Sequence, residues 1–119
     1  MGLDLITFKG NTEIRERAAL TLRVFFRDSA AFSDAAPTNV YYRLDDDGSG
    51  ITLADWTAVA APVLPTNYVD ITLTPEQNRV VNDTRQLERK TISVMADRGL
   101  ATQQVADYTY AVRNLGWVG

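Results

Sequence analysis

The acidic segment from residue 45 to residue 50 has the residue types of a calcium-binding loop. Asp45, Asp47 and Ser49 stand at the first, third and fifth positions of an EF-hand pattern, and such oxygen ligands suit Ca²⁺. The rest of the pattern differs, because Trp56 occupies the place of the bidentate glutamate. A solvated hairpin turn is the preferred interpretation. No metal or other cofactor is predicted, although Asp45, Asp47 and Ser49 remain the candidate ligands.

Catalysis would need other groups, because the chain has no cysteine and no histidine. Ser-His-Asp and Cys-His mechanisms are therefore excluded, and so are disulfides. The carboxylate pairs Asp45/Asp47 and Asp70/Glu76 have the chemistry of an acid and a base, but their spacing brings neither pair into a cleft. Surface acids are the simpler interpretation, and we predict that the protein is not an enzyme.

The charge pattern also limits the partners. The net charge is −3, which argues against direct binding of nucleic acid. A modest basic cluster is predicted around the short helical turn near residues 75–82 and the strand that follows it. It is interpreted either as a salt-bridged face or as a surface for an acidic protein partner, and its members are Arg79, Arg85, Arg89, Lys90 and Arg98. No apolar run approaches the roughly 20 residues of a membrane span, and residues 1–10 do not resemble a signal peptide. We expect a protein that is made and kept in the cytosol, or that is assembled there into something larger.

The elements that position these residues are predicted to be strands. In residues 19–27, Leu20, Leu22, Val24 and Phe26 alternate with residues of the opposite face, which is the period of a half-buried strand. The same pattern recurs in residues 40–45, 68–74, 89–97 and 102–113, and residues 51–57 are predicted to be a return strand after a turn. Val105 is out of phase with the strand at 102–113, which predicts a bulge.

Turn signals separate the strands and favour two sheets. Residues 46–50 form the strongest turn signal, and the segment 58–67, with two prolines, is expected to cross between sheets. A capping box of Thr74 and Gln77 predicts a short helical turn near residues 75–82. The fold class is therefore all-β, a single immunoglobulin-like or fibronectin-type-III-like sandwich of six to seven strands. Trp56 or Tyr42 is expected at the centre of the core.

Some apolar residues lie off the predicted core faces and are candidates for contact with another chain. Residues 1–10 are interpreted as an edge strand or an N-terminal arm, and residues 114–119 as an apolar tail that contacts a partner or folds back. The candidate partner-binding residues are Phe25, Tyr41 and Met95 on outward faces, and Leu115, Trp117 and Val118 in the tail.

Several of these segments resemble a known family. The run 40–46, a Trp in the next strand, the segment 71–78 and the strands 88–97 and 108–115 resemble the small immunoglobulin-like structural proteins of tailed bacteriophages. The resemblance covers roughly residues 39–115 and brings no catalytic residues. It implies a virion protein, above all a capsid decoration or cement protein that binds the major capsid protein, with homo-oligomers among the possible assemblies.

Two alternatives stay open. Within the virion, the chain could instead be a head–tail connector or a tail accessory protein. A carbohydrate- or cell-surface-binding module is the third hypothesis, because Tyr41, Tyr68, Tyr108 and Trp117 would be able to form an aromatic platform for sugars.

Overall fold

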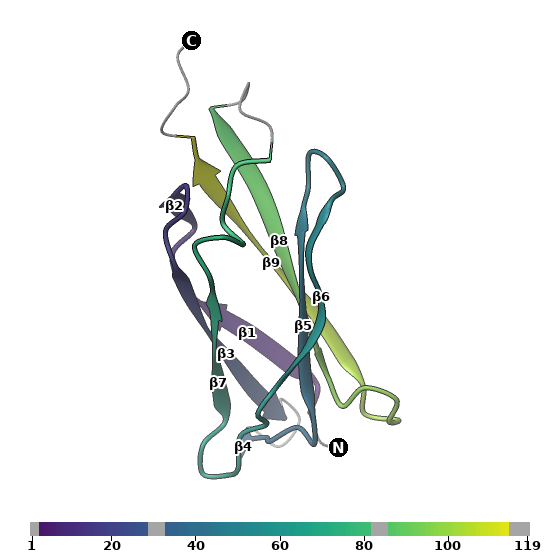
Figure 1. Cartoon of the computed structure of the whole chain (residues 1–119). Coiled ribbons are helices and arrows are strands. Elements are labelled where there is room, and N and C mark those ends of the chain that lie inside the picture. The colour runs from purple at the N-terminus through teal and green to yellow at the C-terminus, as the bar shows by residue number, and fades with distance from the viewer. Residues whose placement is uncertain (1–2, 29–32, 82–85, 115–119) are drawn as a thin grey trace.

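The computed structural model shows an all-β chain folded as two packed sheets (Figure 1). It describes residues 3–28, 33–81 and 86–114. The strands are β1 (Leu5–Lys9), β2 (Glu13–Arg15), β3 (Leu20–Asp28), β4 (Ser33–Asp34), β5 (Val40–Asp46), β6 (Thr52–Val59), β7 (Tyr68–Leu73), β8 (Leu87–Ala96) and β9 (Gln104–Arg113). The predicted β-sandwich is thus confirmed, but the described residues form nine strands instead of six to seven, because β2 and β4 have only three and two residues, too few to show an alternation in the sequence.

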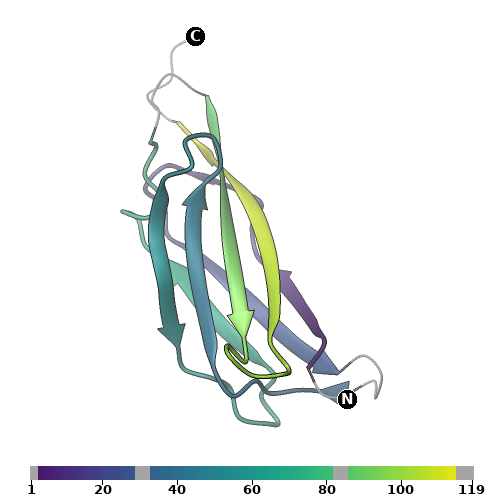
Figure 2. The ribbon, with the colours of Figure 1, turned by 90° about the vertical axis from the view of Figure 1, so that its right-hand side faces the viewer.

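The two sheets have different sizes and face each other across one core. The smaller sheet is built on β3, which pairs with β1 on one side and with β7 and the short β4 on the other. The larger sheet has the order β2-β9-β8-β5-β6. Figure 2 looks onto this larger sheet, with the smaller sheet behind it.

The alternation in the sequence accounts for the strands. In β3, buried and outward-facing residues alternate along all nine positions, and the residue pattern of β8 is similar. Both strands thereby bury one row of mostly apolar side chains and leave the other row at or near the surface. Buried aliphatic residues contribute about 1.5–3 kcal/mol each, so these rows supply the main driving force for the fold.

The largest buried side chains in the core are Tyr110 and Phe26, which are 1% and 0% exposed. The expectation that Trp56 or Tyr42 fills the centre was wrong. Tyr42 is partly buried at the margin of the core, and Trp56 is only half-buried on β6, next to an irregularity in its pairing with β5. This bulge changes which side of β6 each residue faces, so simple alternation fails there.

The N-terminal segment belongs to both sheets. β1 pairs antiparallel with β3, whereas β2 pairs parallel with β9, so residues 5–9 form an edge strand of the smaller sheet. The strand continues into β2 through residues 10–12, and the N–H of Ala111 donates to the carbonyl of Thr12. Of the two interpretations of residues 1–10, an edge strand or an N-terminal arm, residues 5–9 therefore show the edge strand.

Two local expectations are not met. Thr74 and Gln77 make both bonds of the capping box, but residues 75–78 form a turn and residues 75–81 no helix. The local backbone bonds of this turn run from the N–H of Asn78 to the carbonyl of Thr74 and from the N–H of Arg79 to that of Glu76, and residue 82 lies outside the described residues. The bulge at Val105 is absent, because β9 pairs with β8 in continuous register. Val105 is out of phase with the core because it faces outward and is 52% exposed.

Candidate functional site

The acidic turn joins β5 to β6, and its side chains have separate partners. Asp45 accepts hydrogen bonds from Arg43 and from the hydroxyl of Thr52, whereas Asp47 accepts one from Thr91. Ser49 is bound to a different residue, since its N–H and Oγ–H both donate to Oδ2 of Asp46. The turn therefore stabilises itself, and Asp45, Asp47 and Ser49 do not point at a common centre.

No group of three or more acidic residues that would hold a metal ion occurs within the described parts of the chain. The turn is instead built for the hairpin: the N–H of Asp46 donates to the carbonyl of Ile51, and Gly50 adopts a positive φ of 72°. That conformation is easily accessible to glycine and costs other residues more.

An apolar row crosses the outward face of the larger sheet. Tyr41 on β5 is directly opposite Met95 on β8, and Met95 is directly opposite Val105 on β9. Ala58 on β6 extends the row on the other side of Tyr41. Four neighbouring strands thus bring apolar side chains from distant parts of the sequence into one line, which we call the outer apolar row.

The surroundings of this row are polar but largely charge-neutral. The next row along the same face consists of Arg43, Ser93 and Asp107. Arg43 is paired with Asp45 at 3.1 Å, and its guanidinium group is 3.7 Å from Asp55. At the opposite margin, the guanidinium carbon of Arg98 lies 5.1 Å from the centre of the Tyr41 ring. An apolar centre with a polar rim is the usual composition of a protein-binding surface.

The outward face of the smaller sheet carries an aromatic pair. Phe25 on β3 is opposite Tyr68 on β7, with ring centres 5.9 Å apart, and the guanidinium carbon of Arg23 lies 4.1 Å from the centre of the Tyr68 ring. Arg23 binds Asp70 through two hydrogen bonds, which hold the pKa of Asp70 below its ordinary value. A hollow beside this pair is lined by Lys9, Gly10, Thr21, Arg23, Phe25 and Asp70.

The candidate partner-binding residues are therefore divided between two opposite faces. Tyr41 and Met95 are neighbours on the larger sheet, whereas Phe25 lies on the smaller one. Leu115, Trp117 and Val118 lie outside the described residues.

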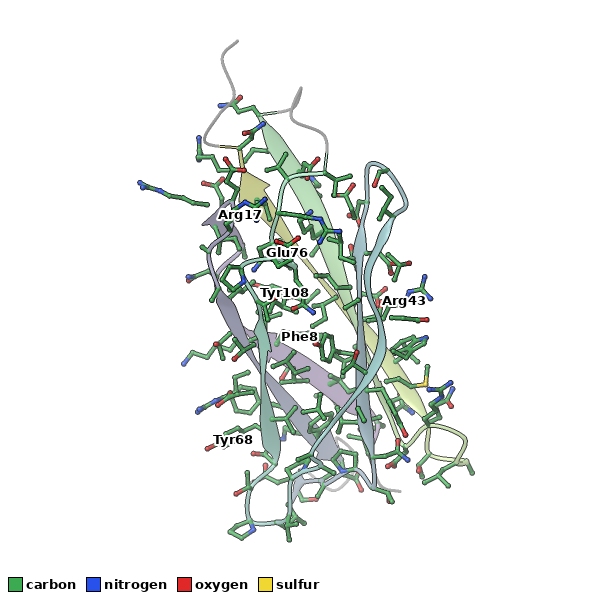
Figure 3. The ribbon with its side chains drawn as sticks, in the orientation of Figure 1. Phe8, Arg17, Arg43, Tyr68, Glu76 and Tyr108 are labelled. Atoms are coloured by element: carbon green, nitrogen blue, oxygen red, sulfur yellow. The ribbon has the colours of Figure 1, made fainter. Side chains whose placement is uncertain are left out.

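The tyrosines proposed as a sugar platform do not share a face either. In Figure 3, Tyr68 points away from the smaller sheet, whereas Tyr108 lies near Phe8 between the sheets. The rings of Phe8 and Tyr108 are 5.4 Å apart, and the Tyr108 hydroxyl donates to the carbonyls of Gly10 and Asn11. Tyr41 belongs to the outer apolar row, and Trp117 lies beyond the described part of the chain.

The predicted basic cluster is dispersed. Arg79 pairs with Glu76 at 3.6 Å, Arg89 is exposed near the start of β8, and Arg98 follows the other end of that strand. Arg85 is outside the described residues. Lys90 was expected at the surface, and this was wrong: its side chain is 0% exposed.

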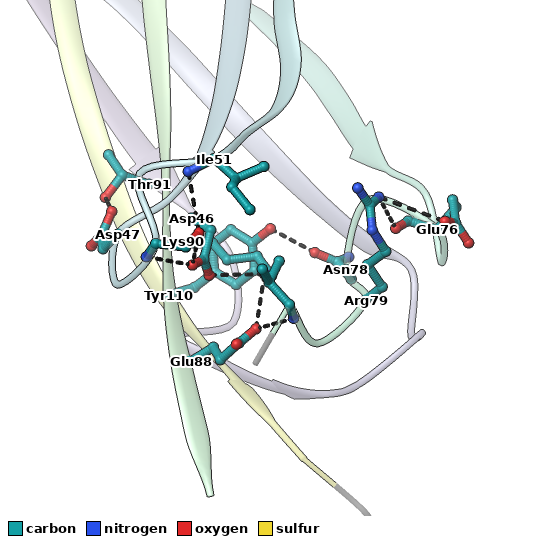
Figure 4. A network of polar contacts seen from close by, with 12 residues as sticks. Asp46, Asp47, Ile51, Glu76, Asn78, Arg79, Glu88, Lys90, Thr91 and Tyr110 are labelled. Carbon is teal, nitrogen blue, oxygen red and sulfur yellow. Dashed lines mark hydrogen bonds and ion pairs between the residues drawn. The ribbon is translucent and has the colours of Figure 1, made fainter. Parts of the chain in front are cut away.

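Lys90 instead belongs to a buried ionic cluster that the sequence interpretation missed (Figure 4). Its Nζ lies 3.2 Å from Oδ1 of Asp46 and 3.4 Å from Oε1 of Glu88, and both carboxylate side chains are 3% exposed. The sequence did indicate that Glu88 and Lys90 face the core, because in the alternating pattern of this strand they fall on the same side as Ile92, Val94 and Ala96. Alternation places residues on faces without regard to their charge.

Buried polar contacts continue next to this cluster. The hydroxyl of Tyr110 donates to Oδ1 of Asn78 at 2.6 Å, and the side-chain amide of Asn78 donates to the carbonyl of Ala18. The N–H of Val81 donates to Oε1 of Glu88 at 2.7 Å. These bonds connect β9, β8 and the turn after β7 at one end of the sandwich.

Comparisons with protein-family models, with curated proteins and with solved structures found no match. Within the described residues, no helix has the length and apolar character needed to cross a membrane.

Proposed function

We propose that the chain is a bacteriophage virion structural protein, a capsid decoration protein that binds the major capsid protein through the larger sheet. The observation that carries the binding surface is the outer apolar row, in which Tyr41, Met95 and Val105 occupy adjacent positions on three strands. The virion context comes from the sequence resemblance to small immunoglobulin-like phage proteins, with which a two-sheet sandwich agrees.

The outward face of the larger sheet suits binding of modest affinity that is repeated over many copies of the protein. Its apolar centre is small, Arg43 beside it is already paired with Asp45 and Asp55, and its strands are joined in a continuous hydrogen-bonded sheet. A decoration protein is present in many copies on a repetitive shell, so modest affinity per copy is enough when neighbouring copies also touch. Rigid, preformed surfaces of this kind lose little conformational freedom on binding.

The direct test is to ask where the chain is in the particle. Virions produced from the genome that encodes this chain would be purified and analysed by mass spectrometry and by cryo-electron microscopy. A decoration protein is expected as density over the capsid lattice, with the larger sheet against the shell. Absence of the chain from purified virions would contradict the proposal.

The same images distinguish a capsid decoration protein from a protein of the neck or tail. A head–tail connector or tail accessory protein would appear as a ring at the neck or along the tail and would leave the capsid surface bare. A glycan-binding module would instead bind sugars as an isolated protein. The aromatic pair of Phe25 and Tyr68 offers little room for a stacked sugar, because Arg23 already covers one side of the Tyr68 ring.

A further inference from the structure

The buried cluster of Lys90, Asp46 and Glu88 is unusual because it encloses one amine and two carboxyl groups. Lys90 and Asp46 are directly opposite each other on the neighbouring strands β8 and β5, and Glu88 lies two residues before Lys90 on the same face. Removing such groups from water costs several kcal/mol per ion, and an ion pair recovers this only partly. The arrangement therefore calls for a role beyond the packing of a core.

We propose that Lys90 and Asp46 join in an intramolecular amide bond, with Glu88 as the group that transfers the protons. The three requirements of this reaction are met by the geometry. The amine and the carboxyl group are in contact at 3.2 Å, a second carboxyl group is 3.4 Å from the same amine, and all three side chains are almost completely shielded from water. Fixed proximity of this kind replaces an activated carboxyl group to a large extent.

The reaction balances without any further reagent. Lys90 Nζ gives a proton to Glu88, and its free electron pair attacks Cγ of Asp46. Glu88 passes that proton to Oδ1, takes a second proton from Nζ and delivers it to the same oxygen. The bond between Cγ and Oδ1 then breaks, and Oδ1 leaves as water. One ammonium and one carboxylate become one amide and one water, and Glu88 returns to its carboxylate form.

Ser49 supplies the stabilisation that the intermediate needs. Its N–H and its Oγ–H both donate to Oδ2 of Asp46, at 3.0 and 2.7 Å. Oδ2 is the oxygen that remains in the amide, and it carries the negative charge while Cγ is tetrahedral. Two preformed donors on this oxygen correspond to an oxyanion hole.

The amide would close the chain between residues 46 and 90 and tie β5 to β8. In a chain without cysteine, such a bond takes the place of a disulfide and limits the freedom of the unfolded state. This inference is independent of the proposed function, because it depends only on the interior of the sandwich.

The test begins with the intact mass of the purified full chain after folding. We expect a mass lower than that of the sequence by one water molecule. The chain has only two lysines, Lys9 and Lys90, so reductive methylation of the denatured protein should modify the N-terminus and Lys9 and leave Lys90 unmodified. Digestion should then give a branched peptide that contains both Asp46 and Lys90.

Matched variants distinguish this bond from other losses of water. A succinimide at Asp47-Gly48 would also remove water, but it would persist in Lys90→Met and leave both lysines reactive. Lys9→Met should keep the mass deficit, whereas Lys90→Met and Glu88→Gln should show the full mass. Asp46→Asn should give the same amide with loss of ammonia. A wild-type protein with the full sequence mass and a reactive Lys90 would overturn the proposal.

Discussion

The hydroxyl of Tyr110 donates a hydrogen bond to Oδ1 of Asn78 at 2.6 Å, inside the sandwich. Asn78 is 0% exposed, and its other groups bind Ala18, Arg17 and Thr74 through their backbones. One amide side chain thereby fixes the turn after β7 against β9 and against the loop before β3. Burial also raises the pKa of Tyr110 well above its ordinary value, so the hydroxyl stays a donor.

Tyr110→Phe is therefore expected to destabilise the fold by about 1–3 kcal/mol, because Oδ1 of Asn78 would be buried without its donor. Urea unfolding gives the measurement. Tyr108→Phe is the matched control, since its hydroxyl binds backbone carbonyls near the surface, where water can replace it. Equal losses in the two variants would contradict the importance of the Tyr110–Asn78 bond.

Met95→Glu should weaken particle binding without unfolding the chain. Met95 faces outward at the centre of the outer apolar row, so a charge there would be buried against the partner but solvated in the free protein. We expect binding to weaken about tenfold or more. Sedimentation with purified particles that lack the protein measures the effect.

Phe25→Glu serves as the comparison for that experiment, because Phe25 lies on the outward face of the other sheet. If the larger sheet binds the shell, this variant should bind like the wild type. The reverse result, with binding lost only in Phe25→Glu, would move the interface to the smaller sheet.

In molecules that lack the proposed amide bond, the carboxylate of Asp46 should make the free energy of unfolding depend on pH in the acidic range. Burial raises its pKa, but hydrogen bonds from Ser49 and the charge of Lys90 outweigh this, and the pKa in the folded state is lowered. The ionised group therefore favours folding above the ordinary Asp pKa of about 4, and this contribution is lost as the pH falls through the folded-state value. The Glu88→Gln variant, in which no amide is expected, should show this loss in urea unfolding at different pH. Adding Asp46→Asn to it should flatten the profile, and unchanged profiles would refute the role of Asp46.

Gly10→Ala should destabilise the protein although Gly10 is exposed. A Cβ at this position would collide with the side chain of Leu22, which is completely buried and cannot yield easily. Overpacking of this kind costs about 1–3 kcal/mol. Thermal unfolding measures it, with Gly99→Asn as a control, because a Cβ at residue 99 meets no neighbour and asparagine tolerates its positive φ. Wild-type stability in Gly10→Ala would show that Leu22 has room to move.

The strands with strict alternation could be predicted from sequence, because a side-chain period of two determines which face is buried. Residues 68–74 and 89–97 correspond closely to β7 and β8, and Tyr41 and Met95 were correctly placed on outward faces. That they are neighbours could not be predicted, because register depends on pairing between segments 54 residues apart in the chain.

The interior polar groups were harder to predict for a related reason. Lys90 follows Arg89 in a polar stretch, and a charged residue is expected in water unless a partner is known. Glu88 is on the same face of the same strand, but the partner Asp46 becomes evident only when β5 and β8 are paired in register. Trp56 was misplaced because its size suggested the core, whereas it lies where an irregularity interrupts the pairing of β6 with β5, and the sequence gives no sign of that irregularity.

The parallel pairing of β2 with β9 has a mechanical consequence. β2 is the second strand of the chain and β9 the last, and they run in the same direction. Just beyond β2, the N–H of Glu16 donates to the carbonyl of Arg113 at the end of β9. A pull that separates the chain ends therefore acts along both strands and loads the bonds between them together in shear, whereas an antiparallel pair pulled from one end would open bond by bond.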